Sequence, residues 1–303
     1  MRQTRLYQRS KQKNQRNLPE RPESKVSELL CRAKGLLSYS EVPDPLFESE
    51  LILSRLLNIE RYQLYVNPPQ VSKKIEEQFL LLISKRANRI PLAYLLKETY
   101  FFGYRFRISK GVFIPRPETE TIVCCAKRLL DGKDRKITIL DICTGCGVLA
   151  IVLARIFPFA RVVATDISKR AVRTAWKNVH LYNLKSQISV RRADIIPPDL
   201  KEKFTLVVAN PPYLASDEIS DSDEEVRKEP FVALYGGKKG MEIIYKILSV
   251  VPEILSKDGF LIMEISPAQV QYFYNLKDSK MSPVSVCKDI SGRERVVVLR
   301  RKV

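Results

Sequence analysis

The sequence predicts an α/β protein in which a small all-helical domain precedes a parallel sheet with crossover helices. Two observations carry this prediction. Up to about residue 96 the apolar residues recur at helical spacing, whereas after residue 112 short β-branched runs alternate with helical segments. Such alternation is typical of a sheet covered by helices, in which a ligand binds at the carboxyl ends of the strands.

Length and composition are those of an ordinary globular chain. The 303 residues are 45% hydrophobic and 28% charged, so the chain can bury a sizeable core and form two domains. The longest apolar run, at 148–157, is too short to span a bilayer and contains Arg155. Six cysteines at irregular spacing indicate reduced thiols, and we therefore expect a cytoplasmic protein with no membrane contact.

The formal net charge of +18 indicates a polyanionic partner or environment. Residues 1–25 hold eight Lys or Arg against two Glu, with almost no large apolar side chains, and are predicted to form a disordered basic tail. The charge that is left after removing the tail is still positive. Weak non-specific contact with RNA is one interpretation, and a merely soluble basic surface is the other.

The helical domain is predicted to cover residues 26–96. Its three long segments, SELLCRAKGLL, LFESELILSRLLN and KKIEEQFLLLISKR, have the apolar spacing of helices. Residues 97–112 contain TYFFGYRFRIS, in which aromatic and basic residues alternate around Gly103, so we expect a β-hairpin linker. Residues 113–303 then form the domain that contains the sheet. Five β-branched runs there are predicted strands, at 136–142, 160–167, 186–194, 204–210 and 259–265.

A glycine loop, DICTGCG, follows the first predicted strand, where glycine permits a sharp turn and close approach to a ligand. Gly145, Gly147 and Ala150 match the dinucleotide fingerprint G-x-G-x-x-G/A. Asp166 lies about 20 residues further on, where that fingerprint has an acid for the ribose hydroxyls. The alternative is a nucleoside without a pyrophosphate, because Asp141 at the loop entrance fits a cationic ligand better than a pyrophosphate.

Acidic residues end three successive predicted strands. Asp141, Asp166 and Asp194 follow the first, second and third of them. Any one aspartate alone is best explained as a turn residue. Three together favour a cationic nucleoside, with Asp166 at its ribose and Asp194 near its base.

Metal and redox chemistry have little support in the sequence. Cys143 and Cys146 form a C-x-x-C pair, which is typical of a redox site or of half a zinc site. The sequence has no second such pair to complete a zinc site. The single histidine, His180, lies late in a predicted helix and is expected to be structural.

The stretch VVANPPYL places Asn210, Pro211, Pro212 and Tyr213 at the end of the fourth predicted strand. Asn before Pro commonly opens a turn, and proline cannot continue a central strand. A simple turn is therefore one interpretation. The other is a rigid backbone that holds hydrogen-bond acceptors and an aromatic ring at the ligand edge of the sheet.

DICTGCG, the acid in ATDIS and NPPY together resemble the class I S-adenosylmethionine-dependent methyltransferases that act on a planar nitrogen. RIPLAYLLKETYFFGYRFRISKGVFIPRPETE, EEVRKEPFVALYGGKKG and KDISGRERVVVL further resemble the release factor glutamine N5-methyltransferases, over nearly the whole chain after about residue 26. The resemblance implies a Rossmann-like seven-stranded methyltransferase sheet, joined by a β-hairpin to a helical substrate-recognition domain. It also implies S-adenosyl-L-methionine as cofactor and, as substrate, the glutamine of the Gly-Gly-Gln motif in peptide-chain release factors. We expect the enzyme to act as a monomer.

The resemblance assigns catalysis to NPPY. The side-chain oxygen of Asn210 and the carbonyl of Pro211 accept hydrogen bonds from the glutamine amide, and the ring of Tyr213 stacks on the amide plane. Pro211 and Pro212 fix these groups in advance. The mouth that admits the glutamine loop is expected to include Arg116, Pro117 and Phe102, and for Phe102 packing in the core is the alternative.

The cofactor is expected to contact the glycine loop and the acids at the strand ends. Its expected binding residues are Asp141, Cys143, Thr144, Gly145, Cys146, Gly147, Asp166, Asp194, Ile195 and Asn210. Two positions depart from the family pattern, because Cys143 and Lys97 stand where the family usually has glycine. A left-handed backbone at Cys143 would carry strain of about 1 kcal/mol.

Other functions stay open at this point. The charge and NPPY also fit a methyltransferase acting on an exocyclic amine of a nucleic acid. A glutamine of a ribosomal protein would undergo the same chemistry. A non-enzymatic RNA-binding or ribosome-binding protein with a degenerate cofactor loop is a further alternative.

Overall fold

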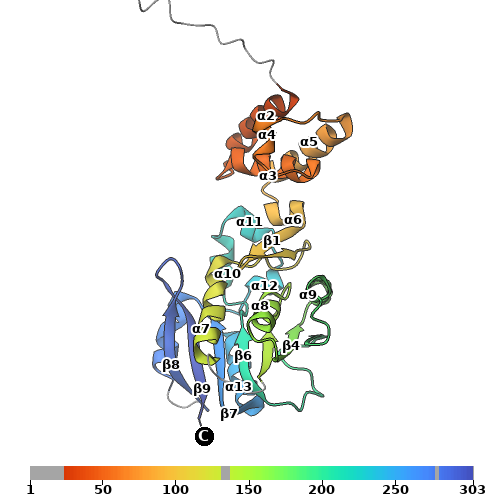
Figure 1. Ribbon diagram of the computed structural model, residues 1–303. Helices are drawn as coiled ribbons and strands as arrows, with labels where there is room; N and C mark the ends of the chain where they lie inside the picture. The colour runs from red at the N-terminus through yellow and green to blue at the C-terminus, as the bar shows by residue number, and fades with distance from the viewer. Residues whose placement is uncertain (1–23, 131–136, 277–279, 303) are drawn as a thin grey trace, which may run out of the picture. The chain divides into compact units, whose positions relative to one another are not determined.

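The computed structural model describes residues 24–130, 137–276 and 280–302, in two compact units that meet between Arg89 and Ile90 (Figure 1). The predicted basic tail lies outside the described residues except for its last two. Ser24 accepts a hydrogen bond from the Ser27 N–H at 3.2 Å and so caps the first helix, which begins at Lys25. The tail prediction was therefore wrong for Ser24 and Lys25.

From Ser24 to Arg89, the described part of the first unit contains four helices. They are α2 (Lys25–Tyr39), α3 (Pro45–Leu57), α4 (Gln63–Val66) and α5 (Lys73–Ala87). Their apolar faces meet in a core that includes Leu29, Ile52 and Phe79, all essentially without solvent exposure. The buried Arg86 pairs with Glu48, with 3.1 Å between Nη2 and Oε1, so its charge is compensated inside the unit.

The boundary between the units lies before residue 96, the expected end of the helical domain. The last short helix, α6 (Leu92–Leu96), belongs to the second unit. The buried hydroxyl of Tyr94 on α6 donates to the Val112 carbonyl at 2.6 Å. This bond ties the helix to the chain that follows it.

A two-stranded hairpin follows α6. Strands β1 (Glu98–Phe101) and β2 (Tyr104–Arg107) are antiparallel, and the turn between them has positive φ at Phe102 and Gly103, 50° and 77°. Lys97 precedes β1 with a left-handed φ of 60°, the conformation for which glycine is the usual residue.

The second unit is built on a sheet of seven strands in the order β5-β4-β3-β6-β7-β9-β8. These are β3 (Thr138–Ile142), β4 (Arg161–Asp166), β5 (Ile188–Arg192), β6 (Phe204–Ala209), β7 (Leu255–Glu264), β8 (Met281–Lys288) and β9 (Glu294–Arg301). Strands β3 to β7 run parallel, while β9 is antiparallel to both β7 and β8. The strand order reverses between β3 and β6, which is where such sheets bind ligands.

Helices cover both faces of this sheet (Figure 1). The second unit also contains η1 (Pro117–Thr119), α7 (Glu120–Leu130), α8 (Val148–Ile156), α9 (Lys169–Leu181), α10 (Ser216–Ser220), α11 (Glu224–Arg227), α12 (Phe231–Leu234), α13 (Glu242–Ile254), η2 (Pro267–Gln269) and α14 (Val270–Tyr274). Ile139 packs with α7, α8 and α9, whereas its neighbour Leu140 packs with α13 and α14. Successive strand residues face opposite helical layers, so the runs are apolar throughout, and the predicted α/β class is confirmed. Among the described residues, no helix combines the length and apolar character that crossing a membrane requires.

Candidate active site

A cavity of about 460 Å³ lies at the carboxyl ends of β3, β4 and β6. Its wall includes the loop residues 143–146, Asp166 at the end of β4, and the segment 210–213 after β6. Three segments far apart in the sequence thus meet where the strand order reverses. A cavity of this size suits a small-molecule ligand.

The loop between β3 and α8 takes its shape from left-handed backbone conformations. The φ angles of Cys143, Gly145 and Gly147 are 58°, 58° and 88°. A Cβ atom added to Gly145 would meet no other atom within 4 Å, so this residue leaves space open beside the loop. A Cβ atom on Gly147 would lie 3.2 Å from the Ala175 Cβ atom, so Gly147 permits α8 and α9 to pack closely. Gly147 does not line the cavity, and its predicted contact with the cofactor stays a prediction.

Asp141 supports this loop from inside the protein. It is fully buried and does not line the cavity, so its predicted contact with the cofactor stays a prediction. Its Oδ2 atom accepts hydrogen bonds from the Thr144 hydroxyl at 2.5 Å and the Ala150 N–H at 3.1 Å. Its Oδ1 atom is buried and accepts none from the described residues. Burial raises the pKa of Asp141 to about 7, against the opposing effect of the two hydrogen bonds.

Asp166, a predicted cofactor-binding residue, lies in the wall of the cavity. Its Oδ2 atom accepts from the Gly145 N–H at 2.9 Å and its Oδ1 atom from the Ser168 N–H at 2.8 Å. Burial raises the pKa of Asp166, and the two backbone hydrogen bonds act in the opposite direction. The carboxylate therefore joins the glycine loop to the start of α9 and keeps acceptor capacity for a ligand.

Asp194 and Ile195 line the cavity next to Asp166, but in different ways. The side chain of Asp194 is 51% exposed and is paired with Lys246. Ile195 is buried and has a φ of 69°, which is rare for a β-branched residue. The Ile195 carbonyl accepts from the buried Thr165 hydroxyl at 2.8 Å, which holds this conformation in place.

The segment Asn210–Tyr213 forms another part of the cavity wall and is packed tightly from behind. A Cβ atom on Gly236 would lie 2.5 Å from the Pro212 carbonyl oxygen, and one on Gly240 would lie 2.1 Å from that of Tyr213. The Gln269 side chain also donates to the Tyr213 carbonyl at 3.1 Å. Because Gly236 and Gly240 have no Cβ atom, the backbone at these two residues can pack directly against the carbonyl groups of the segment Asn210–Tyr213.

A buried hydrogen-bonded relay connects the first and last residues of this segment. Asn210 Nδ2 donates to the Thr119 hydroxyl at 3.0 Å, and Thr119 donates to Glu264 Oε2 at 2.7 Å. The Tyr213 hydroxyl donates to the other oxygen, Glu264 Oε1, at 2.9 Å. Burial raises the pKa of Glu264, while the two hydroxyl donors and the charge of Arg295 lower it.

The predicted mouth residues separate into one that lines the cavity and two that do not. Arg116 lines it and is held by an ion pair with the buried Glu229, which also accepts from the Ile114 N–H at 2.9 Å. Pro117 is exposed at the start of η1, outside the cavity wall. Phe102 packs against the hydrophobic core, which agrees with the alternative stated for it.

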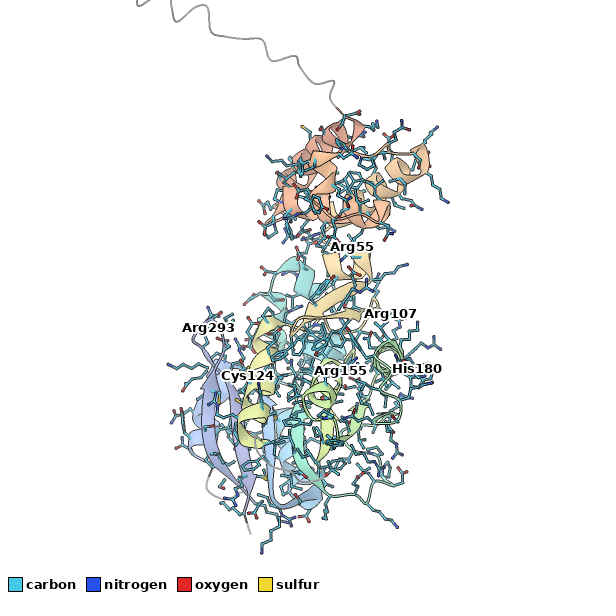
Figure 2. All side chains as sticks on the ribbon, viewed as in Figure 1. Arg55, Arg107, Cys124, Arg155, His180 and Arg293 are labelled. Atoms are coloured by element: carbon cyan, nitrogen blue, oxygen red, sulfur yellow. The ribbon has the colours of Figure 1, made fainter. Side chains whose placement is uncertain are left out.

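The C-x-x-C pair and His180 do not have the environments of reactive ligands. Burial raises the pKa of Cys146 to about 12 and that of Cys143 well above its usual value, which opposes the thiolate that redox and zinc sites use. His180 lies on α9 (Figure 2) and is not among the residues that line the cavity, and its Nδ1 atom is 2.8 Å from the Trp176 carbonyl oxygen. A carbonyl can only accept, so Nδ1 carries the proton there.

Four buried polar residues that support the site were missed in the sequence. Thr119 and Glu264 hold Asn210 and Tyr213, and Glu229 holds Arg116. Asn178 donates to the Cys146 carbonyl at 2.8 Å and to the Arg107 carbonyl at 2.9 Å, and accepts from the Arg107 N–H at 2.9 Å. Glu264 had a signal, since it is an acid at the end of an apolar predicted strand, like the three aspartates.

Two family models match the chain: the methyltransferase small domain over residues 121–227 and the PrmC N-terminal domain over residues 28–96. A release factor glutamine methyltransferase from Clostridium botulinum is 31% identical, over 91% of this chain and 99% of the relative. The one from Chlorobaculum tepidum is 33% identical, over 92% and 98%. A solved methyltransferase from Pyrococcus furiosus, 18% identical over 73% of this chain and 100% of its own, has a TM-score of 0.50, which agrees with the predicted methyltransferase fold. Because relatives above 30% identity cover nearly the whole chain, the protein belongs to the release factor glutamine methyltransferase family.

Proposed function

We propose that the protein transfers a methyl group from S-adenosyl-L-methionine to the side-chain amide nitrogen of the glutamine in the Gly-Gly-Gln motif of peptide-chain release factors. The observation that carries this proposal is the Asn210 carboxamide, which lines the cavity and donates its N–H to Thr119. Its oxygen is left to accept from a substrate amide. Family membership supports the same substrate class.

The glycine-loop end of the cavity fits the cofactor. When bound, S-adenosyl-L-methionine supplies an electrophilic methyl group on a cationic sulfur. Asp166 retains acceptor capacity for the ribose hydroxyls, and the space beside Gly145 admits the methionine portion against the loop backbone. Asp141 acts from beneath the loop through its charge, because a nearby cation favours the ionised form of a buried carboxyl group.

The other end of the cavity fits a glutamine side chain. A carboxamide nitrogen is a poor nucleophile because its lone pair is delocalised into the carbonyl group. Asn210 Oδ1 and the Pro211 carbonyl accept from the two N–H donors, which returns electron density to the nitrogen and aims it at the methyl group. The ring of Tyr213 covers the amide plane. Positioning of this kind is worth roughly 7 to 11 kcal/mol, and no strong base is needed because the alkylated nitrogen loses its proton readily.

The direct test is methyl transfer from labelled cofactor to separate samples of a purified release factor, ribosomal proteins and RNA. We expect label in the release factor alone, and none in a matched release factor whose motif glutamine is replaced by asparagine. Label in RNA would support the alternative of a nucleic-acid methyltransferase. Label in a ribosomal protein would show that the substrate is a ribosomal protein instead of a release factor. Cofactor binding without transfer to any sample would contradict the proposed enzyme.

The basic segment before Ser24 is proposed to add only weak, non-specific attraction to RNA, and the enzyme is proposed to act as a monomer. Its seven Lys or Arg are concentrated in a stretch with few apolar side chains. Deleting residues 1–23 should leave turnover on a release factor unchanged. It should also weaken the salt dependence of RNA binding, because each lost phosphate contact to a duplex reduces the slope of log K against log salt concentration by about 0.9. A truncated protein without activity would place the segment in the substrate site instead.

A further inference from the structure

The hydrogen bonds from Asn210 through Thr119 to Glu264 use a limited number of donor hydrogens. A threonine hydroxyl has one hydrogen to donate, and an ionised carboxylate can only accept. Thr119 lies 2.7 Å from Glu264 Oε2 and 3.0 Å from the Asn210 amide group. If the single hydrogen of Thr119 goes to Glu264, the hydroxyl has only lone pairs left for Asn210. Asn210 must then present its NH₂ group to Thr119 and its oxygen on the opposite side.

We propose that Glu264, acting through Thr119, fixes the orientation of the Asn210 carboxamide, so that its oxygen and not its nitrogen meets the substrate. This inference rests on the proposed function and deepens it. Glu264 and Thr119 are positioning residues, since their side chains hydrogen-bond to each other and to the side chains of Asn210 and Tyr213. The role assigned to Asn210 depends on this orientation.

The opposite orientation of Asn210 is disfavoured inside the protein. It would bring the amide oxygen against the lone pairs of the Thr119 hydroxyl, in a site where Thr119 and Glu264 are almost fully buried. Buried groups that lose their hydrogen bonds are costly to leave unsatisfied. The Tyr213 hydroxyl donates to Oε1 of the same carboxylate, so an ionised Glu264 satisfies both hydroxyl donors at once.

The orientation also selects the substrate. An acceptor oxygen on Asn210 attracts the N–H donors of a glutamine amide and repels the carboxylate of a glutamate. A reversed Asn210 would present N–H donors, which suit a carboxylate or the oxygen end of an amide. Glu264 and Thr119 therefore contribute to the choice of a carboxamide nitrogen as the methyl acceptor.

The first test replaces the hydroxyl without changing the shape. Thr119→Val should lower single-turnover methylation of a release factor roughly 10- to 100-fold with cofactor affinity nearly unchanged, and it should also lower the melting temperature, because the buried Glu264 loses a hydrogen-bond donor. Thr119→Ser, which keeps the hydroxyl, should recover most of the rate. In an Asn210→Ala background, Thr119→Val should have almost no further effect, because its action passes through Asn210. An equal loss in both backgrounds would overturn the proposal.

The second test does not depend on activity, so it separates this inference from the proposed function. In protein labelled with ¹⁵N-asparagine, the side-chain NH₂ signal of Asn210 is assigned by its loss in Asn210→Ala. We expect this signal to shift in Thr119→Val and in Glu264→Gln, because its hydrogen-bond acceptor is removed or its polarity disturbed. An unchanged signal in both variants would overturn the inference even in an active enzyme. A shifted signal in a protein that methylates no release factor would instead refute the proposed substrate.

Discussion

The two ends of the cavity are made rigid in different ways. At the glycine-loop end, the backbone itself carries the unusual conformations, with positive φ at Cys143, Gly145, Gly147 and Ile195. At the Asn210–Tyr213 end, two prolines fix the backbone and buried side chains hold the functional groups. Loss of a side-chain hydrogen bond should therefore matter most at the second end, whereas a residue that resists left-handed backbone conformations should matter most at the first.

The largest effect is expected from Asn210→Ala. Removing this acceptor should lower turnover on the order of 10² to 10³, as for other preorganised polar partners of a transition state, while cofactor affinity stays nearly constant. Asn210→Asp should bind cofactor but turn over slowly, because its charge would pair with the cationic sulfur before transfer and lose that pairing during it. The measurement is single-turnover methylation beside calorimetric cofactor titration. Full activity of the folded Ala variant would leave the segment a simple turn.

A smaller effect is expected from Asp166→Ala at the other end of the cavity. Cofactor binding should weaken by about 1.5 to 3 kcal/mol, because charge-assisted hydrogen bonds to the ribose and to the Gly145 N–H are lost. Asp194→Ala is the matched control, since this half-exposed side chain is paired with Lys246 and should contribute less. Calorimetry on both variants measures the difference. Equal losses would mean that burial does not distinguish the two acids.

The two glycines of the loop should respond differently to an added methyl group. Gly147→Ala should lower the free energy of unfolding by about 1 to 2 kcal/mol, because the new Cβ atom meets Ala175 and the backbone is left-handed. Gly145→Ala has open space around its Cβ atom and should lose less stability but more cofactor affinity. Denaturant unfolding and cofactor titration of both variants provide the comparison. The reverse pattern would assign the open space beside Gly145 to something other than the cofactor.

The smallest effect is expected from Cys143→Gly. Relief of a left-handed φ of 58° should stabilise the folded protein by about 0.5 to 1 kcal/mol, once the greater freedom of unfolded glycine is included, and should improve cofactor affinity slightly. Lys97→Gly is the matched control, because it relieves a similar φ of 60° at a residue that does not line the cavity. It should raise the free energy of unfolding by a similar amount without changing cofactor affinity. Weaker cofactor binding by Cys143→Gly would show that the cysteine side chain itself contributes to the site.

The sequence was informative where function depends on local patterns. Asp166 and Asn210 follow apolar strands directly, so the rule that parallel strands end at one edge was enough to place both at one cavity. The same rule could not separate Asp141, which the strand keeps fully buried, from Asp166, which reaches the wall. That distinction depends on how far each strand extends before the chain turns.

Partners distant in sequence could not be predicted. Glu229 and Arg116 are brought together only by the folded chain, as are Glu264 and Thr119. Phe102 illustrates the related problem for apolar side chains, because a hairpin residue has the same pattern whether its ring packs in the core or lines a cavity. Packing decides between these outcomes, and periodicity carries no information about it.

Asn178 couples the motion of the glycine loop to that of the β1–β2 hairpin. Its side-chain carboxamide hydrogen-bonds to the backbone N–H and carbonyl of Arg107 on β2 and to the carbonyl of Cys146 beside the cavity. If either segment opens, this side chain must release one partner inside the protein or carry the other segment along. We therefore expect the loop and the hairpin to open as one cooperative unit. The hydrogen-exchange rate of the Arg107 amide then reports the free energy of opening of a loop nearly forty residues away along the chain.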